Sequence, residues 1–165
     1  MSDLNDICLA CGLCCDGTLL GFVQLESEEV PVMKELMQVE NANGDGVFIQ
    51  PCSKYCDGCT IYSKRPKQCA SFKCGLLKSF EKKELDFDMA IELINEVKQR
   101  KIVVEKKLAL QEFKLQSHSF YFKMVELNRL HKSMSSPSTQ NYLDLISELK
   151  QLDEILSEKF DLSLS

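Results

Sequence analysis

The nine cysteines of this 165-residue chain all lie within its first 74 residues. Cysteines that serve as small apolar core residues would be scattered along the whole chain. A disulfide framework is disfavoured by the odd number of cysteines. It is also disfavoured by the neighbours Cys14 and Cys15, whose Cα atoms lie about 3.8 Å apart across a trans peptide, closer than disulfide geometry usually allows. Metal binding is therefore the interpretation that the cysteines favour.

Two cysteine motifs make up the cluster. Residues 8–15 read Cys-Leu-Ala-Cys-Gly-Leu-Cys-Cys, and residues 52–74 contain the other five cysteines. The C-x2-C spacing lets two thiolates converge on one ion, and Gly12 suits the positive φ of the turn between them. The C-x2-C-x2-C run is also typical of [4Fe–4S] proteins. Because adjacent side chains point in different directions, Cys14 and Cys15 either serve different centres or only one of them is a ligand.

The charge of the chain changes sign between the two motifs. Residues 1–50 carry one lysine against nine acids, whereas residues 51–84 carry eight basic residues against three acids. A basic flank would offset the negative charge of a thiolate centre. A solvated basic face is an equally open alternative. Arg65 stands out among these residues because its planar guanidinium can hydrogen-bond to backbone or to sulfur.

Together the two motifs resemble the CxxCxxCC cysteine-cluster family, which is described as a zinc- or iron-chelating domain. The matching pattern is Cys-x2-Cys-Gly-x-Cys-Cys followed by Cys-x6-Cys-Thr-Ile-Tyr-x2-Arg-Pro-x2-Cys-x2-Phe-x-Cys, over roughly residues 8–80. The resemblance implies that the metal ligands are Cys8, Cys11, Cys14, Cys15, Cys52, Cys59, Cys69 and Cys74. Tyr62, Arg65, Pro66 and Phe72 match accompanying positions.

Cys56 is additional to this pattern, so it is either a spare thiol or a replacement ligand acting through the C-x2-C knuckle that it forms with Cys59. The family includes larger proteins that resemble flagellin lysine methylases and carry an iron–sulfur centre. This chain shows no Gly-rich strand-to-helix turn for a nucleotide-like cofactor, so that activity is not carried over to it. No catalytic residues are assigned, and whether the protein is an enzyme stays open.

The remaining sequence predicts a mainly α fold. We expect a small irregular, metal-stabilised cysteine-cluster domain with one or two short strands over residues 1–84. An α-helical half over residues 85–165 follows and packs on it as one compact unit. A strand is expected within residues 19–25, a helix capped by Ser27 and running to about Val39, and a loop over residues 41–46. Asp86 or Asp88 is expected to cap the first long helix and Ser138 the last.

Apolar residues recur at helical spacing through residues 90–108, 120–134 and 142–156. The stripe of the last segment is too short to argue for a coiled coil, so packing within the chain is favoured over a dimer seam. The protein is accordingly expected to be a monomer or a homodimer, with the helical half open to a protein partner. His118 and His131 lie in this half, and an ordinary surface or helix-end position is favoured for both over metal binding.

Composition excludes several classes of function. No apolar run is long enough to span a membrane, and the acidic N-terminal segment is unlike a signal peptide, so a cytoplasmic location is expected. The net charge of −5 argues against nucleic-acid binding. The cofactor predicted is an iron–sulfur cluster, by a narrow margin over zinc, in a structural or redox role. An accessory protein or enzyme of a modification pathway and a metal delivery or storage protein are the alternatives.

Overall fold

The computed structural model describes residues 4–42, 45–136 and 139–165. The elements of these residues are α1 (Leu4–Cys11), β1 (Phe22–Leu25), α2 (Val30–Leu36), β2 (Glu40–Ala42), β3 (Asp45–Ile49), the short 3-10 helix η1 (Tyr62–Lys64), α3 (Lys67–Ser71), α4 (Gly75–Glu81), α5 (Phe87–Ala109), α6 (Phe120–Ser133) and α7 (Gln140–Phe160). The fold is mainly α with a few short strands, as the sequence predicts.

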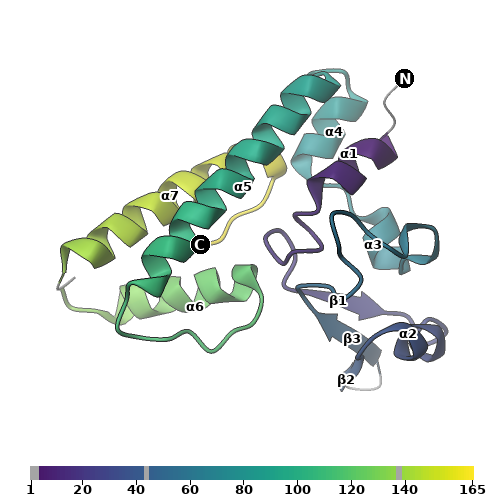
Figure 1. Cartoon of the computed structure of the whole chain (residues 1–165), viewed down its shortest axis with the longest axis horizontal. Helices are drawn as coiled ribbons and strands as arrows, with labels where there is room; N and C mark the ends of the chain where they lie inside the picture. Colours follow the sequence, from purple (N-terminus) through teal and green to yellow (C-terminus); the bar gives the residue numbers. More distant parts are fainter. Residues whose placement is uncertain (1–3, 43–44, 137–138) are drawn as a thin grey trace.

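The long helices α5 and α7 run side by side, with α6 below them and α1 and α4 near one end of α5 (Figure 1). The apolar stripes predicted for these segments lie mainly on their buried faces. Met134, the end of the second stripe, is an exception, because it lies beyond the end of α6 and is exposed. Helix α7 buries Tyr142, Leu145, Leu149, Leu152, Leu156 and Phe160. Since this stripe packs within the chain, mainly against α5, it is not an unpaired seam.

The helix ends confirm one predicted cap and correct another. The Asp86 side chain accepts a hydrogen bond from the backbone N–H of Met89 and caps α5. Ser138 lies outside the described residues, and the cap of α7 is Thr139. The prediction that Ser27 caps a helix reaching Val39 is wrong: α2 starts after Glu29 and ends at Leu36. The chain then enters β2, whose pairing with β3 ends the helical run.

The sheet is antiparallel with the strand order β1-β3-β2. It has three strands where the sequence predicts one or two, because both ends of the expected loop at residues 41–46 are paired in β2 and β3. Val23, Leu25, Met33 and Phe48 form a small core between the sheet and α2. Lacking a large buried face of its own, the sheet depends on its surroundings for stability.

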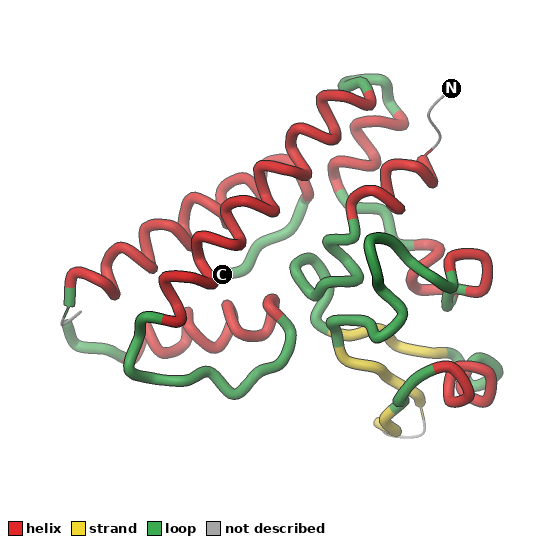
Figure 2. Tube along the Cα trace, viewed as in Figure 1, coloured by secondary structure: helices red, strands yellow, loops and turns green. Residues whose placement is uncertain are grey.

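The main core joins the cysteine-containing region to the helical region. Ile7, Leu13, Leu19, Leu76 and Leu77 are buried in the same apolar cluster as α5, α6 and α7. Irregular segments fill the space between the helices and the sheet, as the loops of Figure 2 show. Among the described residues, no helix combines the length and the apolar character needed to cross a membrane.

Candidate metal centre

A single cavity between the helices and the sheet collects the predicted ligands. Its volume is about 210 Å³. Its walls include all eight cysteines that the family resemblance assigns, and they do not include Cys56. All nine cysteines are free thiols. The structure therefore brings together the same eight residues that the resemblance implies.

The first motif begins on a helix and ends in a tight turn. Cys8 and Cys11 stand three residues apart on α1, so they share one face of the helix. Gly12 then takes a φ of +68° and the ring of Tyr55 occupies the place where a Cβ atom would be. This is the positive φ that the sequence predicts, and the contact adds a second reason for glycine. The turn that follows delivers Cys14 and Cys15 to the cavity.

Two lysines of α5 hold this turn in position. Lys98 Nζ donates to the carbonyl oxygen of Ala10 at 3.0 Å. Lys101 Nζ lies 3.0 Å from one carboxylate oxygen of Asp16, and the other oxygen accepts a hydrogen bond from the backbone N–H of Thr18 at 2.9 Å. The side chains of Lys101 and Asp16 are only 13% and 21% exposed, so solvent screens this pair less than a surface pair. The helical half therefore fixes the path of the first motif.

Backbone contacts join the second motif to the first. The N–H of Cys52 donates to the carbonyl oxygen of Cys15 at 2.7 Å. The N–H of Lys54 points at Cys52 Sγ at 3.4 Å, a contact that lowers the pKa of that thiol while burial raises it more strongly. Cys59 forms an isolated bridge with Tyr55, which closes the knuckle.

Cys56 stands on the outside of this knuckle. Its side chain is exposed, and its backbone N–H donates to the carbonyl oxygen of Gly58 at 2.9 Å. Asp57 and Gly58 have positive φ angles of 48° and 145°, as the turn character of this dipeptide implies. The knuckle thus directs Cys59 to the cavity and leaves Cys56 outside it.

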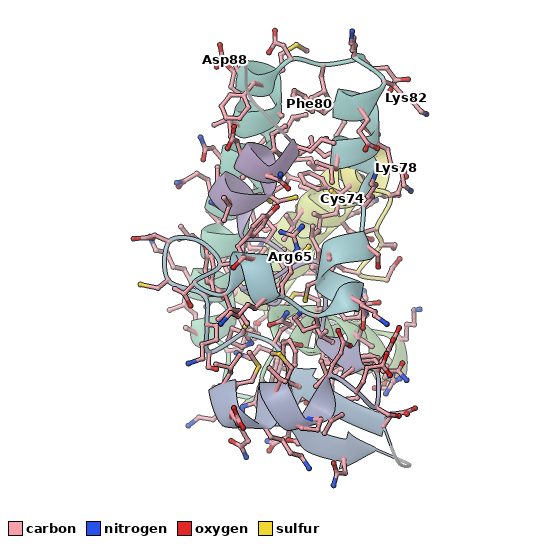
Figure 3. All side chains as sticks on the ribbon, turned by 90° about the vertical axis from the view of Figure 1, so that its right-hand side faces the viewer. Arg65, Cys74, Lys78, Phe80, Lys82 and Asp88 are labelled. Atoms are coloured by element: carbon pink, nitrogen blue, oxygen red, sulfur yellow. The ribbon has the colours of Figure 1, made fainter. Side chains whose placement is uncertain are left out.

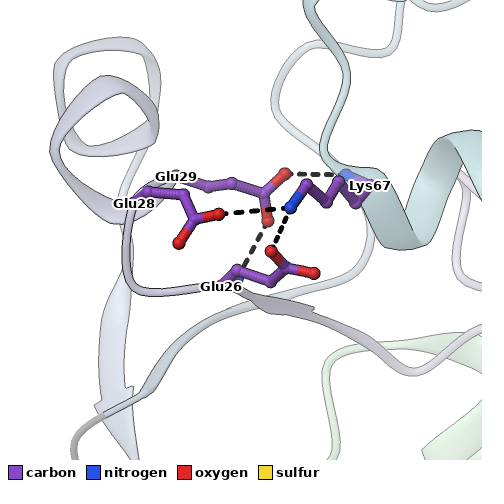
Figure 4. A network of polar contacts seen from close by, with 4 residues as sticks. All are labelled: Glu26, Glu28, Glu29 and Lys67. Carbon is purple, nitrogen blue, oxygen red and sulfur yellow. Dashed lines mark hydrogen bonds and ion pairs between the residues drawn. The ribbon is translucent and has the colours of Figure 1, made fainter.

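The last two cysteines come from α3 and α4. Cys69 lies on α3, and Cys74 is the N-cap residue of α4. Helix α3 is tied to the turn after β1 by the network in Figure 4, in which Lys67 pairs with Glu26 and Glu28 and donates its backbone N–H to Glu29 at 2.7 Å. These side chains are solvent-exposed, so Lys67 belongs to a solvated face and does not offset thiolate charge.

Arg65 is a basic residue whose side chain turns toward the cavity. Its guanidinium lies 3.6 Å from the centroid of the Tyr62 ring, and Tyr62 in turn donates its hydroxyl to Asn5 at 2.8 Å. Arg65 lines the cavity, and its Nε and Nη1 atoms are buried without a hydrogen-bond partner among the described residues. Figure 3 shows it among the elements that surround Cys74. Buried unpaired donors are costly, so this position calls for an acceptor.

Four of the thiols interact around the helices. Burial raises the pKa of Cys11 to about 12, and Cys74 and Cys8 add to the effect. Burial also raises the pKa of Cys14 well above its usual range, and the next largest causes are the neighbouring thiols of Cys11 and Cys74. For Cys8, burial and then Cys74 raise the pKa, while Arg65 lowers it.

The other four thiols interact beside the sheet. The pKa of Cys15 rises to about 12 through burial, followed by Cys59, Cys52 and Cys69. That of Cys69 also rises to about 12 through burial, then Cys52 and Cys59, against the lowering effect of Arg65. Thiols in such surroundings keep their protons until a cation takes the place of those protons.

The donor set fits a thiophilic metal, although the side chains as they stand do not form a finished site. Over residues 4–42, 45–136 and 139–165, no three or more His, Cys, Asp or Glu side chains are arranged so that they could hold a metal ion. A metal would require these side chains to converge, and such convergence couples metal binding to folding. What fits is the chemistry: eight sulfurs and one unpaired guanidinium in a cavity that is otherwise largely apolar.

Two contributors to the site are not found from the sequence. Tyr55 packs on Gly12, and the ion pair between Lys101 and Asp16 anchors the turn across 85 residues of sequence. Neither contact has a local sequence signal, since both depend on long-range packing. His118 and His131 do not line the cavity; His131 Nδ1 lies 3.2 Å from the hydroxyl oxygen of Tyr142 in the helical half.

A scan against protein-family models finds no match to this chain, and searches of curated proteins and of solved structures find none either. The resemblance to the CxxCxxCC family is therefore supported by the sequence motifs alone, and the candidate metal centre is supported by the geometry described above.

Proposed function

We propose that this protein binds metal through cysteine thiolates in the cavity between α1, α4 and the sheet, as an iron–sulfur or zinc protein. One observation carries the proposal: the eight cysteines of the two motifs line a single cavity, while the ninth stands outside it. Four-thiolate coordination suits both zinc and [4Fe–4S] clusters.

The irregular backbone around the cavity supports a structural role for the metal. Residues 12–21 and 50–61 contain no helix or extended strand of their own apart from the isolated bridge between Tyr55 and Cys59. Long irregular segments inside a compact fold need an additional source of order. Metal–thiolate bonds would supply it, because binding free energy becomes folding free energy when the site and the fold form together.

The unpaired guanidinium of Arg65 supports an anionic group within the cavity. A zinc ion with four thiolates carries a formal charge of about −2, and sulfurs bound to metal accept hydrogen bonds. In this proposal Arg65 donates its buried N–H groups to such sulfurs. The Fe–S interpretation remains the narrowly preferred one because of the C-x2-C-x2-C run, and zinc is the direct alternative.

Anaerobic purification of the full chain tests the proposal. Metal content, acid-labile sulfide and the visible absorption spectrum are measured together. A brown protein with labile sulfide identifies an iron–sulfur cluster, and a colourless protein with bound zinc identifies a zinc protein. A chain that contains neither, and that takes up neither zinc nor iron and sulfide on reconstitution, would show that the proposed function is wrong.

A further inference from the structure

The cavity has two walls, and each contributes its own cysteines. Cys11 belongs to the main apolar core, and Cys14 and Cys74 pack against that core. Cys52 and Cys69 pack instead against the small core beside the sheet. The thiols are therefore divided between the helical and the sheet side of the fold.

Local connections place two of the remaining cysteines, Cys8 and Cys15. Cys8 lies one helical turn before Cys11 on α1, and α1 contacts α4, whose N-cap is Cys74. On the opposite wall, the carbonyl oxygen of Cys15 is hydrogen-bonded to the backbone of Cys52. The first motif thus reaches across the cavity and changes sides between its two adjacent cysteines.

The knuckle of the second motif places Cys59 on the sheet side. Cys59 is bridged to Tyr55, and the backbone N–H of Tyr55 donates to the carbonyl oxygen of Cys52 at 3.1 Å. Ile61, two residues after Cys59, packs against the small core beside the sheet. Cys59 therefore lies on the same wall as Cys52.

We propose that the eight cysteines form two four-thiolate metal centres. The helical centre consists of Cys8, Cys11, Cys14 and Cys74, and the sheet centre consists of Cys15, Cys52, Cys59 and Cys69. This proposal rests on the proposed function and adds the number of centres and their ligands. Zinc and [4Fe–4S] clusters each take four thiolates, so eight donors complete two centres without a histidine or carboxylate.

Arg65 connects the two groups, because it lines the same cavity as the cysteines of both walls. Its Nε and Nη1 atoms, buried and unpaired, are available to sulfurs of both centres.

Paired cysteine variants test the division in the anaerobically purified full chain. We expect Cys74→Ser and Cys69→Ser each to retain about half of the wild-type metal. Combining Cys74→Ser with Cys8→Ser, from the same centre, should remove no more metal than Cys74→Ser does alone. Combining Cys74→Ser with Cys69→Ser, from different centres, should remove all of it. Cys56→Ser is the matched control and should keep the full amount.

The outcomes separate this proposal from the one on which it rests. If one single variant loses all metal, or one loses none, the division into two centres is wrong while metal binding stands. If the wild-type chain binds no metal, both proposals fail. Circular dichroism of each variant checks the long helices, and Cys8→Ser with Cys59→Ser provides a second pair in case Cys74 or Cys69 is needed for folding.

Discussion

At the scale of single residues, Arg65 differs from the other basic residues around the second motif. Lys73 pairs with Glu81 and Lys78 with Asp161 near the surface, whereas the guanidinium of Arg65 has buried donors without partners. The sequence leaves open whether the basic segment offsets thiolate charge or forms a solvated face. The structure places Lys67, Lys73 and Lys78 in ion pairs with carboxylates, whereas Arg65 has its buried donors at the cavity. Burial raises the pKa of the Cys52 and Cys74 thiols, whereas Lys54 and Lys78 lower it.

Replacing Arg65 by methionine should weaken metal binding. Hydrogen bonds to charged groups contribute about 1.5–3 kcal/mol, which corresponds to a roughly 10- to 100-fold loss of affinity. Arg65→Lys keeps the charge but not the planar fork, so it should fall between wild type and Arg65→Met. Chelator competition measures the effect. An unchanged chelator midpoint in Arg65→Met would show that its donors do not face the metal.

A matched pair of variants compares a cysteine that lines the cavity with one that lies outside it. Cys14→Ser should lose bound metal, because Cys14 lines the cavity and is enclosed by the main core. Cys56→Ser should leave the metal content unchanged, because Cys56 is exposed and lies outside the cavity. Metal per chain is measured after anaerobic purification. A lowered metal content in Cys56→Ser would mean that Cys56 replaces one of the eight ligands.

At the scale of elements, helix α5 positions the first motif by means of Lys101. Lys101→Met should destabilise the protein by about 1–3 kcal/mol, because it leaves the partly buried Asp16 carboxylate without its cation. Lys67→Met is the control: its side chain is 61% exposed, and its loss should matter far less. Denaturant unfolding of both variants measures the difference. Equal effects would show that burial of the Lys101 pair is unimportant.

The loop before α6 is held by a carboxylate whose effect depends on pH. Glu126 accepts hydrogen bonds from the N–H of Gln116 at 3.0 Å and of Ser117 at 3.1 Å. The backbone hydrogen bond from Gln116, the largest cause, lowers the pKa of Glu126 below its ordinary value of 4.5. Because the pKa of this carboxyl group is lower in the folded than in the unfolded state, the carboxylate stabilises the fold at pH values above its unfolded-state pKa. This stabilisation is lost as the pH falls through the folded-state pKa.

Glu126→Gln should therefore lower the thermal midpoint at neutral pH, by an amount equivalent to about 1 kcal/mol. The difference from wild type should shrink when the pH is lowered from 6 through about 4. Thermal unfolding across this range measures it, with Glu112→Gln in the same loop as control. A difference that stays constant down to pH 3 would contradict the electrostatic explanation.

Helix ends show where sequence reasoning succeeds and where it fails. Asp86 caps α5 as predicted, since its contact with Met89 is local. Ser27 fails as a cap because the Glu29 carboxylate binds the backbone of Glu26 and of the distant Lys67, which fixes the turn differently. The contact with Lys67 joins segments far apart in the chain, so the sequence around Ser27 does not predict it.

At the scale of the whole molecule, two cores of unequal size flank the cavity. The main core includes Ile7 and Leu77 from the cysteine-containing region and most of the buried residues of α5, α6 and α7. The small core beside the sheet has four buried residues. Stability is therefore expected to be unequal across the molecule, with the sheet side more dependent on the metal.

Metal removal should loosen the sheet side and leave the long helices formed. Hydrogen exchange before and after anaerobic chelation is expected to quicken over residues 12–25 and 45–72, while α5 and α7 remain protected. Reloading with metal should restore the slow exchange. Global loss of protection would mean that the main core also depends on the centre, and no change would argue for a protein that binds metal without needing it to fold.

The sequence by itself determined what kind of elements the chain forms. Apolar periodicity defined the faces of α5, α6 and α7, and the resemblance to the CxxCxxCC family set eight cysteines apart from Cys56. Both signals are local, so they can be read without knowing which segments meet. Only the tertiary structure decided that the eight thiols share one cavity and that Cys56 stays outside it. Those facts depend on contacts between α1, α4, α5 and the sheet, and long-range packing of this kind leaves no mark in a short stretch of sequence.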